Sequence, residues 1–325
     1  MTRLSLASLA ACCALGVVRP APAAAQQPEQ GYITMSDSAR IFYKIAGHPG
    51  PGIDTLIAIH GGPGMDLESI YNDWARGLGR RHVIIFYDQR GGGKSELPTD
   101  TSRLVAARQI QDLDEVRRHF GLTKVTLLAH SYGPLLAASY AIAHPDAVKK
   151  MVFFGPVPPR RGDFFTRYGH NIQSRLDSSQ LAAMSRLDAE MTADSSSDAT
   201  VRHACKDYWA LGLRPRLASP AGLGVVRSDL CSTDPQGIRY GMSVANRVIM
   251  SSYGDWDLRP QLRTLDVPLL VVHGQQETIP MDLVEEWVTS MPNARLVKVP
   301  NAAHFTYAEQ PALVWPVVER FLAQR

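Results

Sequence analysis

Six short apolar runs constrain the fold of this chain more than any other feature. They are continuous and rich in β-branched residues, as are strands that are buried on both faces of a sheet. Helical stretches lie between them, and strands that alternate with helices favour a mostly parallel, doubly wound α/β sheet. The runs are Thr55–His60, Val83–Asp88, Val125–His130, Met151–Phe154, Pro268–His273 and Leu296–Val299.

Two further patterns complete the predicted sheet and its cover. The stretch Leu104–Phe120 places apolar residues at helical spacing, and Gly121 stands where such a helix would end. Tyr32–Met35 and Arg40–Ile45 are typical of an opening hairpin. We therefore expect one long helix over 104–120 and a hairpin at the edge of the sheet.

The alternation of strands and helices stops between residues 156 and 253. This stretch contains helical fragments at Leu181–Met191 and Val201–Leu211 and no convincing buried strand. It follows the sixth strand, and an insertion there projects from the carboxyl ends of the strands, where such folds bind ligands. We predict a core of residues 26–155 and 254–325 and a mainly helical cap of residues 156–253.

Residues 1–25 have the pattern of a cleaved export signal. Arg3 precedes the apolar run Leu4–Val18, and Ala23–Ala25 fits a small-residue cleavage site. An N-terminal membrane anchor is the first alternative, but a bilayer span needs about 20 apolar residues. A lipoprotein signal ending at Cys12 is the second. We expect export to the periplasm or the medium, with no membrane span after residue 25.

Composition excludes several classes of protein. Apolar residues make up 45% of the 325 residues and charged residues 20%, so the chain is neither disordered nor fibrous. The formal charge is +3, but Arg3 and Arg19 lie in the predicted signal. The remaining chain is nearly neutral and lacks the basic character that nucleic acids and anionic membranes attract.

Only two of the four cysteines remain after removal of the predicted signal. Cys12 and Cys13 lie within it, whereas Cys205 and Cys231 lie in the predicted cap. In an oxidising compartment these two are expected to form a disulfide, the alternative being two buried free thiols. No metal-ligand spacing surrounds them, so no metal is predicted.

The segment from Val125 to Ala143 carries the strongest chemical signal. It reads as an apolar strand, a turn with Ser131, and an apolar helix. A nucleophile elbow needs small residues two positions before and two after the serine, which are Ala129 and Gly133 here. An ordinary strand-to-helix turn that happens to contain a serine is the alternative. We predict that Ser131 is a nucleophile.

A nucleophilic serine needs a base and an acid that orients the base. In this fold the order along the chain is serine, acid, histidine. Glu277 follows the predicted strand at Leu269–His273, and His304 follows the last strand. Asp282 is the nearest rival acid. Weaker candidates for the base end strands or lie in turns; they are His48, His60, His130, His144 and His273.

The oxyanion of a tetrahedral intermediate needs two backbone N–H donors. Tyr132, directly after the nucleophile, is one expected donor. Gly62, in the loop His60–Gly64, is the other, although that loop is also compatible with a simple tight turn. The segment Arg90–Ser95 ends like a phosphate-binding loop, but Asp88 occupies the position of that motif's first glycine, so no nucleotide site is predicted.

Together these motifs resemble the prolyl aminopeptidase (proline iminopeptidase) family of serine α/β-hydrolases, which includes the tricorn-interacting aminopeptidases. The resemblance covers about residues 31–155 and 253–325, and the cap is not matched. Its carriers are the motifs His60–Gly64 and Asp88–Ser95, the elbow at Ser131, Asp255–Asp257 and the closing Asn301–Phe305. Ala129 replaces a glycine that is usual in the family, and Glu277 replaces an aspartate.

The resemblance implies an α/β-hydrolase fold and a Ser-His-Glu acyl-enzyme mechanism without a cofactor. We expect release of an N-terminal residue, with proline as one candidate, from short peptides. An aminopeptidase needs a carboxylate for the substrate amine, and the cap offers Asp188, Glu190 and Asp207 as candidates, the alternative for each being a residue on a solvated helix face. An ester or lactone hydrolase needs no such acid and is the alternative; a non-catalytic binding protein is a remote one. Ser131 at the elbow argues against epoxide hydrolases and dehalogenases, which place an aspartate there. No oligomeric state is predicted.

Overall fold

The apolar runs form one eight-stranded sheet with the strand order β1-β2-β4-β3-β5-β6-β7-β8. The computed structural model describes residues 29–324, without the side chains of 220 and 221; the predicted signal, residues 1–25, lies outside the described residues. The strands are β1 (Gln30–Thr34), β2 (Arg40–Ala46), β3 (Thr55–Ile59), β4 (Val83–Tyr87), β5 (Val125–His130), β6 (Val148–Phe154), β7 (Leu269–Gly274) and β8 (Ala294–Val299).

Only the opening hairpin makes the sheet mixed. Strand β1 pairs antiparallel with β2, and β2 pairs antiparallel with β4. All other neighbours are parallel. The predicted edge hairpin and the mostly parallel sheet are therefore confirmed.

The central strands bury both faces because their side chains alternate between two apolar clusters. In β3, Ile57 and Ile59 pack into the cluster on one face, and Leu56 and Ala58 into the cluster on the other. Strands β5, β6 and β7 alternate in the same way, which explains why these segments read as continuous apolar runs.

Helices cover both faces, as a doubly wound sheet requires. Helices α2, α3 and α10 supply residues to one cluster, and α1, α11 and α12 to the other. The helices of the core are α1 (Glu68–Leu78), α2 (Ala106–His119), α3 (Gly133–Ala143), α9 (Arg259–Leu262), α10 (Met281–Ser290), α11 (Thr306–Glu309) and α12 (Pro311–Leu322), with 3₁₀ turns η1 (Thr101–Leu104) and η2 (Pro145–Ala147).

Two elements differ from their predictions. The helix expected from Leu104 begins at Ala106 because Val105 is extended, with ψ 153°, and separates α2 from a 3₁₀ turn. The run Leu296–Val299 was expected to be buried on both faces, but β8 is the edge strand and most of its residues are only partly buried or exposed. Within this run Lys298 is exposed, and its ammonium forms an ion pair with Glu285 at the surface, as an edge strand allows.

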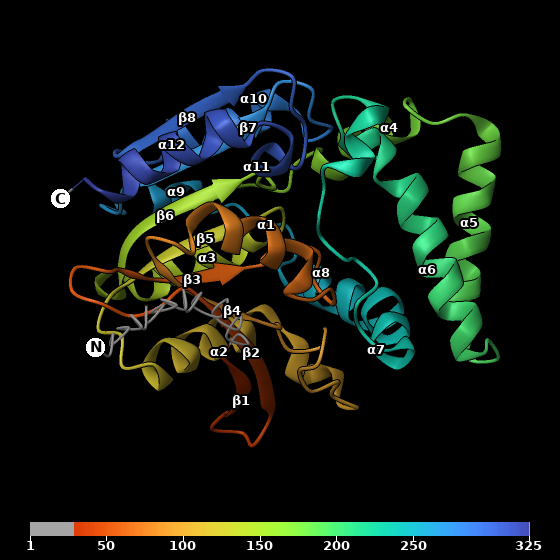
Figure 1. Ribbon diagram of the computed structural model, residues 1–325, viewed down its shortest axis with the longest axis horizontal. Coiled ribbons are helices and arrows are strands. Elements are labelled where there is room, and N and C mark those ends of the chain that lie inside the picture. The colour runs from red at the N-terminus through yellow and green to blue at the C-terminus, as the bar shows by residue number, and fades with distance from the viewer. Residues whose placement is uncertain (1–28, 325) are drawn as a thin grey trace, which may run out of the picture.

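Between β6 and β7 the regular elements of the described chain are helices and helical turns joined by loops, with one isolated bridge between Arg160 and Asp257. Figure 1 shows α5 and α6 side by side outside the layers of the core, with α4 near one end of this pair and α7 near the other. The elements are α4 (Phe164–Gln173), α5 (Ser178–Thr192), α6 (Asp198–Gly212), η3 (Arg214–Arg216), η4 (Pro220–Gly224), α7 (Pro235–Tyr240), the π-helical turn η5 (Gly241–Ala245) and α8 (Asn246–Ser252). We retain residues 156–253 as the proposed cap.

Cys205 in α6 and Cys231 form the expected disulfide, with Cα atoms 6.0 Å apart. Both cysteines are buried in a small apolar cluster of the proposed cap that also contains Leu187, Met191 and Val201. The bond therefore ties the segment after η4 to the helical pair α5–α6.

No helix within residues 29–324 is long and apolar enough to span a membrane.

Removal of this disulfide is expected to lower the free energy of unfolding. The bond closes a loop with a sequence separation of 26. In the chain-entropy model, a loop of that span contributes about 3–4 kcal/mol. Urea unfolding of the Cys205→Ala/Cys231→Ala variant, with and without reductant, measures the effect. A reductant that destabilises the wild type no more than the variant would contradict the prediction.

Candidate active site

Ser131 lies at a strained turn between β5 and α3. Its φ is +60°, a left-handed conformation that non-glycine residues rarely adopt. The turn is tight: a Cβ on Gly61 would lie 2.6 Å from the Ser131 Cβ, and one on Gly133 would lie 2.6 Å from the Ile59 carbonyl oxygen. Glycines at these two positions therefore permit the elbow that the sequence predicted.

His304 and Glu277 come together behind the elbow, as predicted. The His304 imidazole Nδ1 lies 2.8 Å from the Glu277 Oε2, and both side chains are buried. The other carboxylate oxygen, Oε1, accepts hydrogen bonds from the N–H groups of Thr278 and Ile279 and from the Thr278 hydroxyl. The carboxylate is thus fixed in position, and in the neutral form of the His304 ring it keeps the proton on Nδ1 and leaves Nε2 as the basic nitrogen.

The pairing of Glu277 with His304 makes the stability of the fold sensitive to acid. Burial alone would raise the pKa of Glu277, but the charge and hydrogen bond of His304 outweigh it and lower the pKa from 4.5 to about 2. Because the unfolded chain takes up the proton first, the ionised carboxylate stabilises the fold above 4.5, and this contribution is lost as the pH falls toward 2.

We therefore expect the free energy of unfolding to fall between about pH 5 and about pH 3 more steeply in the wild type than in Glu277→Gln. Urea titrations at a series of pH values measure both slopes. Parallel slopes for the two proteins would show that Glu277 is not the group responsible.

Ser131 and His304 line one cavity together with both predicted oxyanion donors, Gly62 and Tyr132. In the described chain the N–H groups of Gly62 and Tyr132 donate to no protein acceptor, so both are available to a ligand. No hydrogen bond joins Ser131 to His304 there, and catalytic hydrogen bonds of this kind commonly tighten only when substrate binds.

The loop that carries Gly62 is held from behind by the motif Asp88–Ser95. The Gln89 N–H donates to His60 Nε2, and the Gln89 amide donates to the His60 carbonyl. His60 Nδ1 then donates to the Gly61 carbonyl, and burial lowers the pKa of His60 to about 4, which keeps the ring neutral. Asp88 accepts hydrogen bonds from the N–H groups of Leu67 and Lys94. This motif supports the loop rather than binding phosphate.

The rival candidates take no part in the Glu277–His304 pair, although His130 lines the same cavity. Asp282 forms an exposed ion pair with Arg167 at 2.7 Å. His130 and His273 are buried, and Nε2 of each ring lies 3.1 Å from a backbone carbonyl oxygen. Burial lowers the pKa of each imidazole. His48 and His144 do not line the cavity. Among the residues the structure describes, no group of three or more His, Cys, Asp or Glu side chains is arranged to hold a metal.

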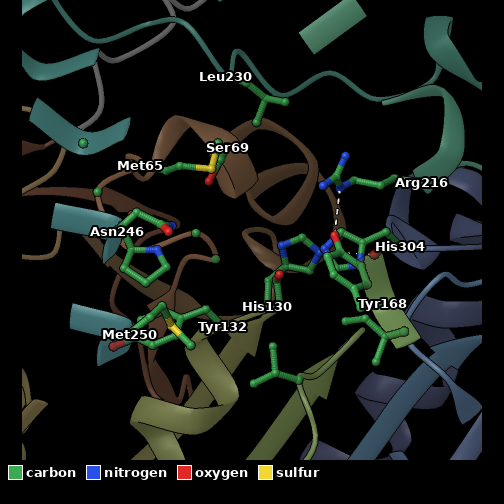
Figure 2. A pocket seen from close by; sticks show the side chains of 18 of the residues that line it. Met65, Ser69, His130, Tyr132, Tyr168, Arg216, Leu230, Asn246, Met250 and His304 are labelled. Carbon is green, nitrogen blue, oxygen red and sulfur yellow. Dashed lines mark hydrogen bonds between the residues drawn. The ribbon is translucent and has the colours of Figure 1, made fainter. Parts of the chain in front are cut away.

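The cavity has a volume of about 360 Å³ and is lined mainly by apolar and aromatic side chains. Figure 2 shows Tyr168, Arg216 and His304 on one side of it, and Tyr132, Asn246 and Met250 on the other. No Asp or Glu is among the described residues of its lining. The remaining lining side chains include Met65, Val157, Phe164, Phe165, Tyr208, Trp209, Leu230, Met242, Ile279 and Phe305.

The three cap acids predicted to receive a substrate amine do not line this cavity. Asp188 is exposed on α5. Glu190 lies 3.9 Å from Arg186, and Asp207 lies 3.3 Å from His203, in both cases along one helix at the surface. The helical faces that carry them point to solvent, so none of the three candidates reaches the cavity and the alternative of a solvated helix face holds for each.

Gly155 is a site residue that the sequence analysis missed. It follows β6, has a φ of +51°, and a Cβ there would lie 3.1 Å from His304 Nδ1 and 3.3 Å from Glu277 Oε2. A bare backbone at this point lets the imidazole and the carboxylate meet. The only signal in the sequence is a glycine directly after a buried strand.

Gly155→Ala is therefore expected to displace His304. At these distances the two side chains must give by a few tenths of an ångström, so kcat is expected to fall by less than the about 10²-fold that follows a displacement of about 1 Å. The strained φ costs about 1–3 kcal/mol of stability. Steady-state kinetics and urea unfolding measure the two effects. The matched control is Gly169→Ala in α4, where a Cβ meets nothing within 4 Å. Equal kinetics for the two variants would contradict the role of Gly155.

The proposed cap contacts the oxyanion loop through two glycines. A Cβ on Gly64 would lie 2.6 Å from the Gly241 carbonyl oxygen, and one on Gly241 would lie 2.1 Å from the Gly64 carbonyl oxygen. Gly241 opens the π-helical turn η5. Backbone therefore packs on backbone where the proposed cap contacts the loop of Gly62.

A serine at a strand-to-helix elbow of such a sheet, with a histidine–carboxylate pair after its last strands, defines the class of the serine hydrolases with this fold. The sequence profile of the family described as alpha/beta hydrolase fold matches residues 54–311. The chain belongs to that family and is a serine hydrolase.

Known proteins of this family are similar over most of the chain. A proline iminopeptidase of Heyndrickxia coagulans is 25% identical over 293 residues, which cover 90% of this chain and 98% of that protein. The crystal structure of a proline iminopeptidase of Mycobacterium smegmatis matches with a TM-score of 0.65 at 21% identity, covering 90% and 97% of the two chains. The predicted resemblance to that group is confirmed. A naproxen esterase of Bacillus subtilis matches with a TM-score of 0.65 at 16% identity, covering 91% and 92%.

Proposed function

We propose that this hydrolase releases the N-terminal residue of short peptides through an acyl-enzyme on Ser131. The Ser131 hydroxyl attacks the carbonyl of the first residue while His304 takes the hydroxyl proton, and the N–H groups of Gly62 and Tyr132 hold the oxyanion. His304 then gives the proton to the departing amine as the C–N bond breaks. A water molecule, deprotonated by His304, hydrolyses the ester and frees Ser131.

One observation supports the hydrolytic part of this proposal above all others. Ser131, His304 and two N–H groups without protein acceptors line the same cavity, and Glu277 holds Nδ1 of His304. The peptide part follows from the similarity to proline iminopeptidases over about nine tenths of the chain. Aromatic side chains of the lining offer apolar contact to a pyrrolidine ring, which keeps proline as one candidate.

Hydrolysis of carboxylic esters or lactones is the second candidate, and one observation favours it. An α-ammonium group in an apolar cavity needs a compensating partner, and no carboxylate lines this one among the described residues. An ester substrate makes no such demand. The matching fold of the Bacillus subtilis naproxen esterase is compatible with this candidate.

A paired assay separates the two candidates. Amino-acyl naphthylamides with a free amine, the same compounds with the amine blocked, and p-nitrophenyl esters are compared by kcat/KM. Under the proposed function the free naphthylamides are hydrolysed and blocking the amine abolishes turnover. If blocking the amine leaves kcat/KM unchanged, or if only esters are hydrolysed, the aminopeptidase proposal is wrong and the second candidate replaces it.

We also propose that the protein is exported and that residues 1–25 are removed. The leader pattern supports this, and so does the Cys205–Cys231 disulfide, because such bonds persist in oxidising compartments. Intact-mass measurement of the protein from its native host tests the proposal, since a mature chain beginning at Gln26 is expected. A chain that keeps residue 1, or one that begins at a lipid-modified Cys12, would contradict it.

A further inference from the structure

Arg216 is a positive charge in a cavity lined mainly by apolar and aromatic side chains. It is the one Lys or Arg among the described residues of the lining, and it shares that lining with Ser131 and His304. A charge beside an apolar cavity is costly unless a partner compensates it. The contacts of Arg216 therefore show whether its charge is compensated within the protein or is available to a ligand.

The structure supplies no anionic partner within the described chain. The Arg216 Nε donates to the Tyr168 hydroxyl at 3.1 Å, and one terminal nitrogen donates to the Gly212 carbonyl. The rings of Tyr168 and Trp209 flank the guanidinium at 5.8 and 5.9 Å. These contacts orient the group without neutralising it, and a guanidinium has five N–H donors, so donors remain for a ligand.

Arg216 lies on the side of the cavity that the leaving group of the substrate would occupy. Its backbone carbonyl accepts the N–H of His304 at 3.0 Å, which joins η3 to the loop of the proposed base. In Figure 2 the Arg216 and Tyr168 side chains lie on the His304 side, with the hydrogen bond between them drawn, whereas Asn246 and Met250 lie opposite. Because His304 protonates the leaving group, the departing half of the substrate lies on the side of Arg216.

We propose that Arg216 binds a carboxylate on the leaving group, so that the preferred substrates are dipeptides with a free C-terminus. This inference rests on the proposed function. In a dipeptide the leaving group is one amino acid, whose carboxylate is separated from the scissile nitrogen by a single Cα. A planar guanidinium binds a carboxylate through two parallel hydrogen bonds. The cavity, at about 360 Å³, falls near the lower end of the range for small-molecule sites, about 300–1,000 Å³.

The test compares a dipeptide with its C-terminal amide, which differs only in the charge that Arg216 would bind. The first residue is the one whose naphthylamide is hydrolysed best. Charge-assisted hydrogen bonds of this kind are worth a factor of about 10–100. Wild-type kcat/KM is therefore expected to favour the free dipeptide by about 10–100-fold, mainly through KM.

Variants of Arg216 locate the effect. In Arg216→Gln the dipeptide-to-amide ratio is expected to fall to about 1, and Arg216→Lys is expected to keep part of the preference, because it retains the charge without the fork. A ratio of two substrates on one variant cancels any general loss of folding or of catalysis. The matched control is Arg214→Gln, an exposed arginine in the same 3₁₀ turn, whose ratio stays at the wild-type value.

Two other outcomes would overturn this inference alone, and a third would overturn the proposed function with it. A wild-type ratio near 1, in an enzyme that hydrolyses free naphthylamides, overturns the role of Arg216 and leaves the proposed function standing. A preference that survives in Arg216→Gln also overturns it, because the carboxylate is then bound elsewhere. If only esters are hydrolysed, and no naphthylamide, dipeptide or amide is, then the proposed function and this inference fall together.

Discussion

Ser131→Ala is expected to lower kcat by about 10⁴–10⁶-fold, the largest effect of any single change in this protein. The variant loses the atom that forms the acyl-enzyme, while the cavity, the Glu277–His304 pair and both oxyanion donors remain. KM changes little for the same reason. The loss is measured with whichever substrate the wild type hydrolyses best, and a fluorophosphonate probe measures nucleophilicity directly.

The probe is expected to label the wild type and not Ser131→Ala. Ser251→Ala, which changes an exposed serine of α8, is the matched control and retains both labelling and turnover. Labelling of Ser131→Ala at the wild-type level, or of neither protein, would remove Ser131 from the proposed mechanism. Circular dichroism of the variant shows that the loss does not come from unfolding.

Glu277→Gln is expected to lower kcat by about 10³–10⁴-fold with little change in KM. An amide that faces His304 with its NH₂ group stabilises the wrong tautomer, with the proton on Nε2, so the ring no longer takes the proton of Ser131. The change also removes the ionised acceptor of the Thr278 and Ile279 N–H groups. Steady-state kinetics above pH 6 measure the effect.

Two further variants sharpen this test. Glu277→Asp restores the charge on a shorter side chain and is expected to recover part of the lost activity. Asp282→Asn removes only an exposed ion pair with Arg167 and should leave kcat within about twofold. A large loss in Asp282→Asn with a small one in Glu277→Gln would exchange the two acids in the mechanism.

The sequence predicted those parts of the fold and site whose physics is local or depends on order along the chain. Ser131 was recognisable because an apolar strand, small residues and an apolar helix must all surround an elbow. His304 and Glu277 followed from their places after the last two strands. The left-handed φ of Ser131 and the 2.8 Å contact between His304 and Glu277 agree with this expectation.

The parts that sequence could not supply depend on how the proposed cap is oriented. Asp188, Glu190 and Asp207 lie on helices, as expected, but periodicity does not say which face of an isolated helical pair turns to the cavity. Arg216 lies in a 3₁₀ turn without apolar periodicity, so no pattern distinguishes it from its exposed neighbour Arg214. Gly155 has a role only because two distant loops meet above it.

The glycine pair Gly64 and Gly241 limits how far the proposed cap can be exchanged as a separate module. A cap exchanged from a relative brings its own residue to the position of Gly241, and any side chain there collides with the backbone of Gly64. The collision would be transmitted two residues back, to the N–H of Gly62. Engineering a new specificity by cap transplantation would then cost turnover even for substrates that fit, unless the graft retains this one glycine.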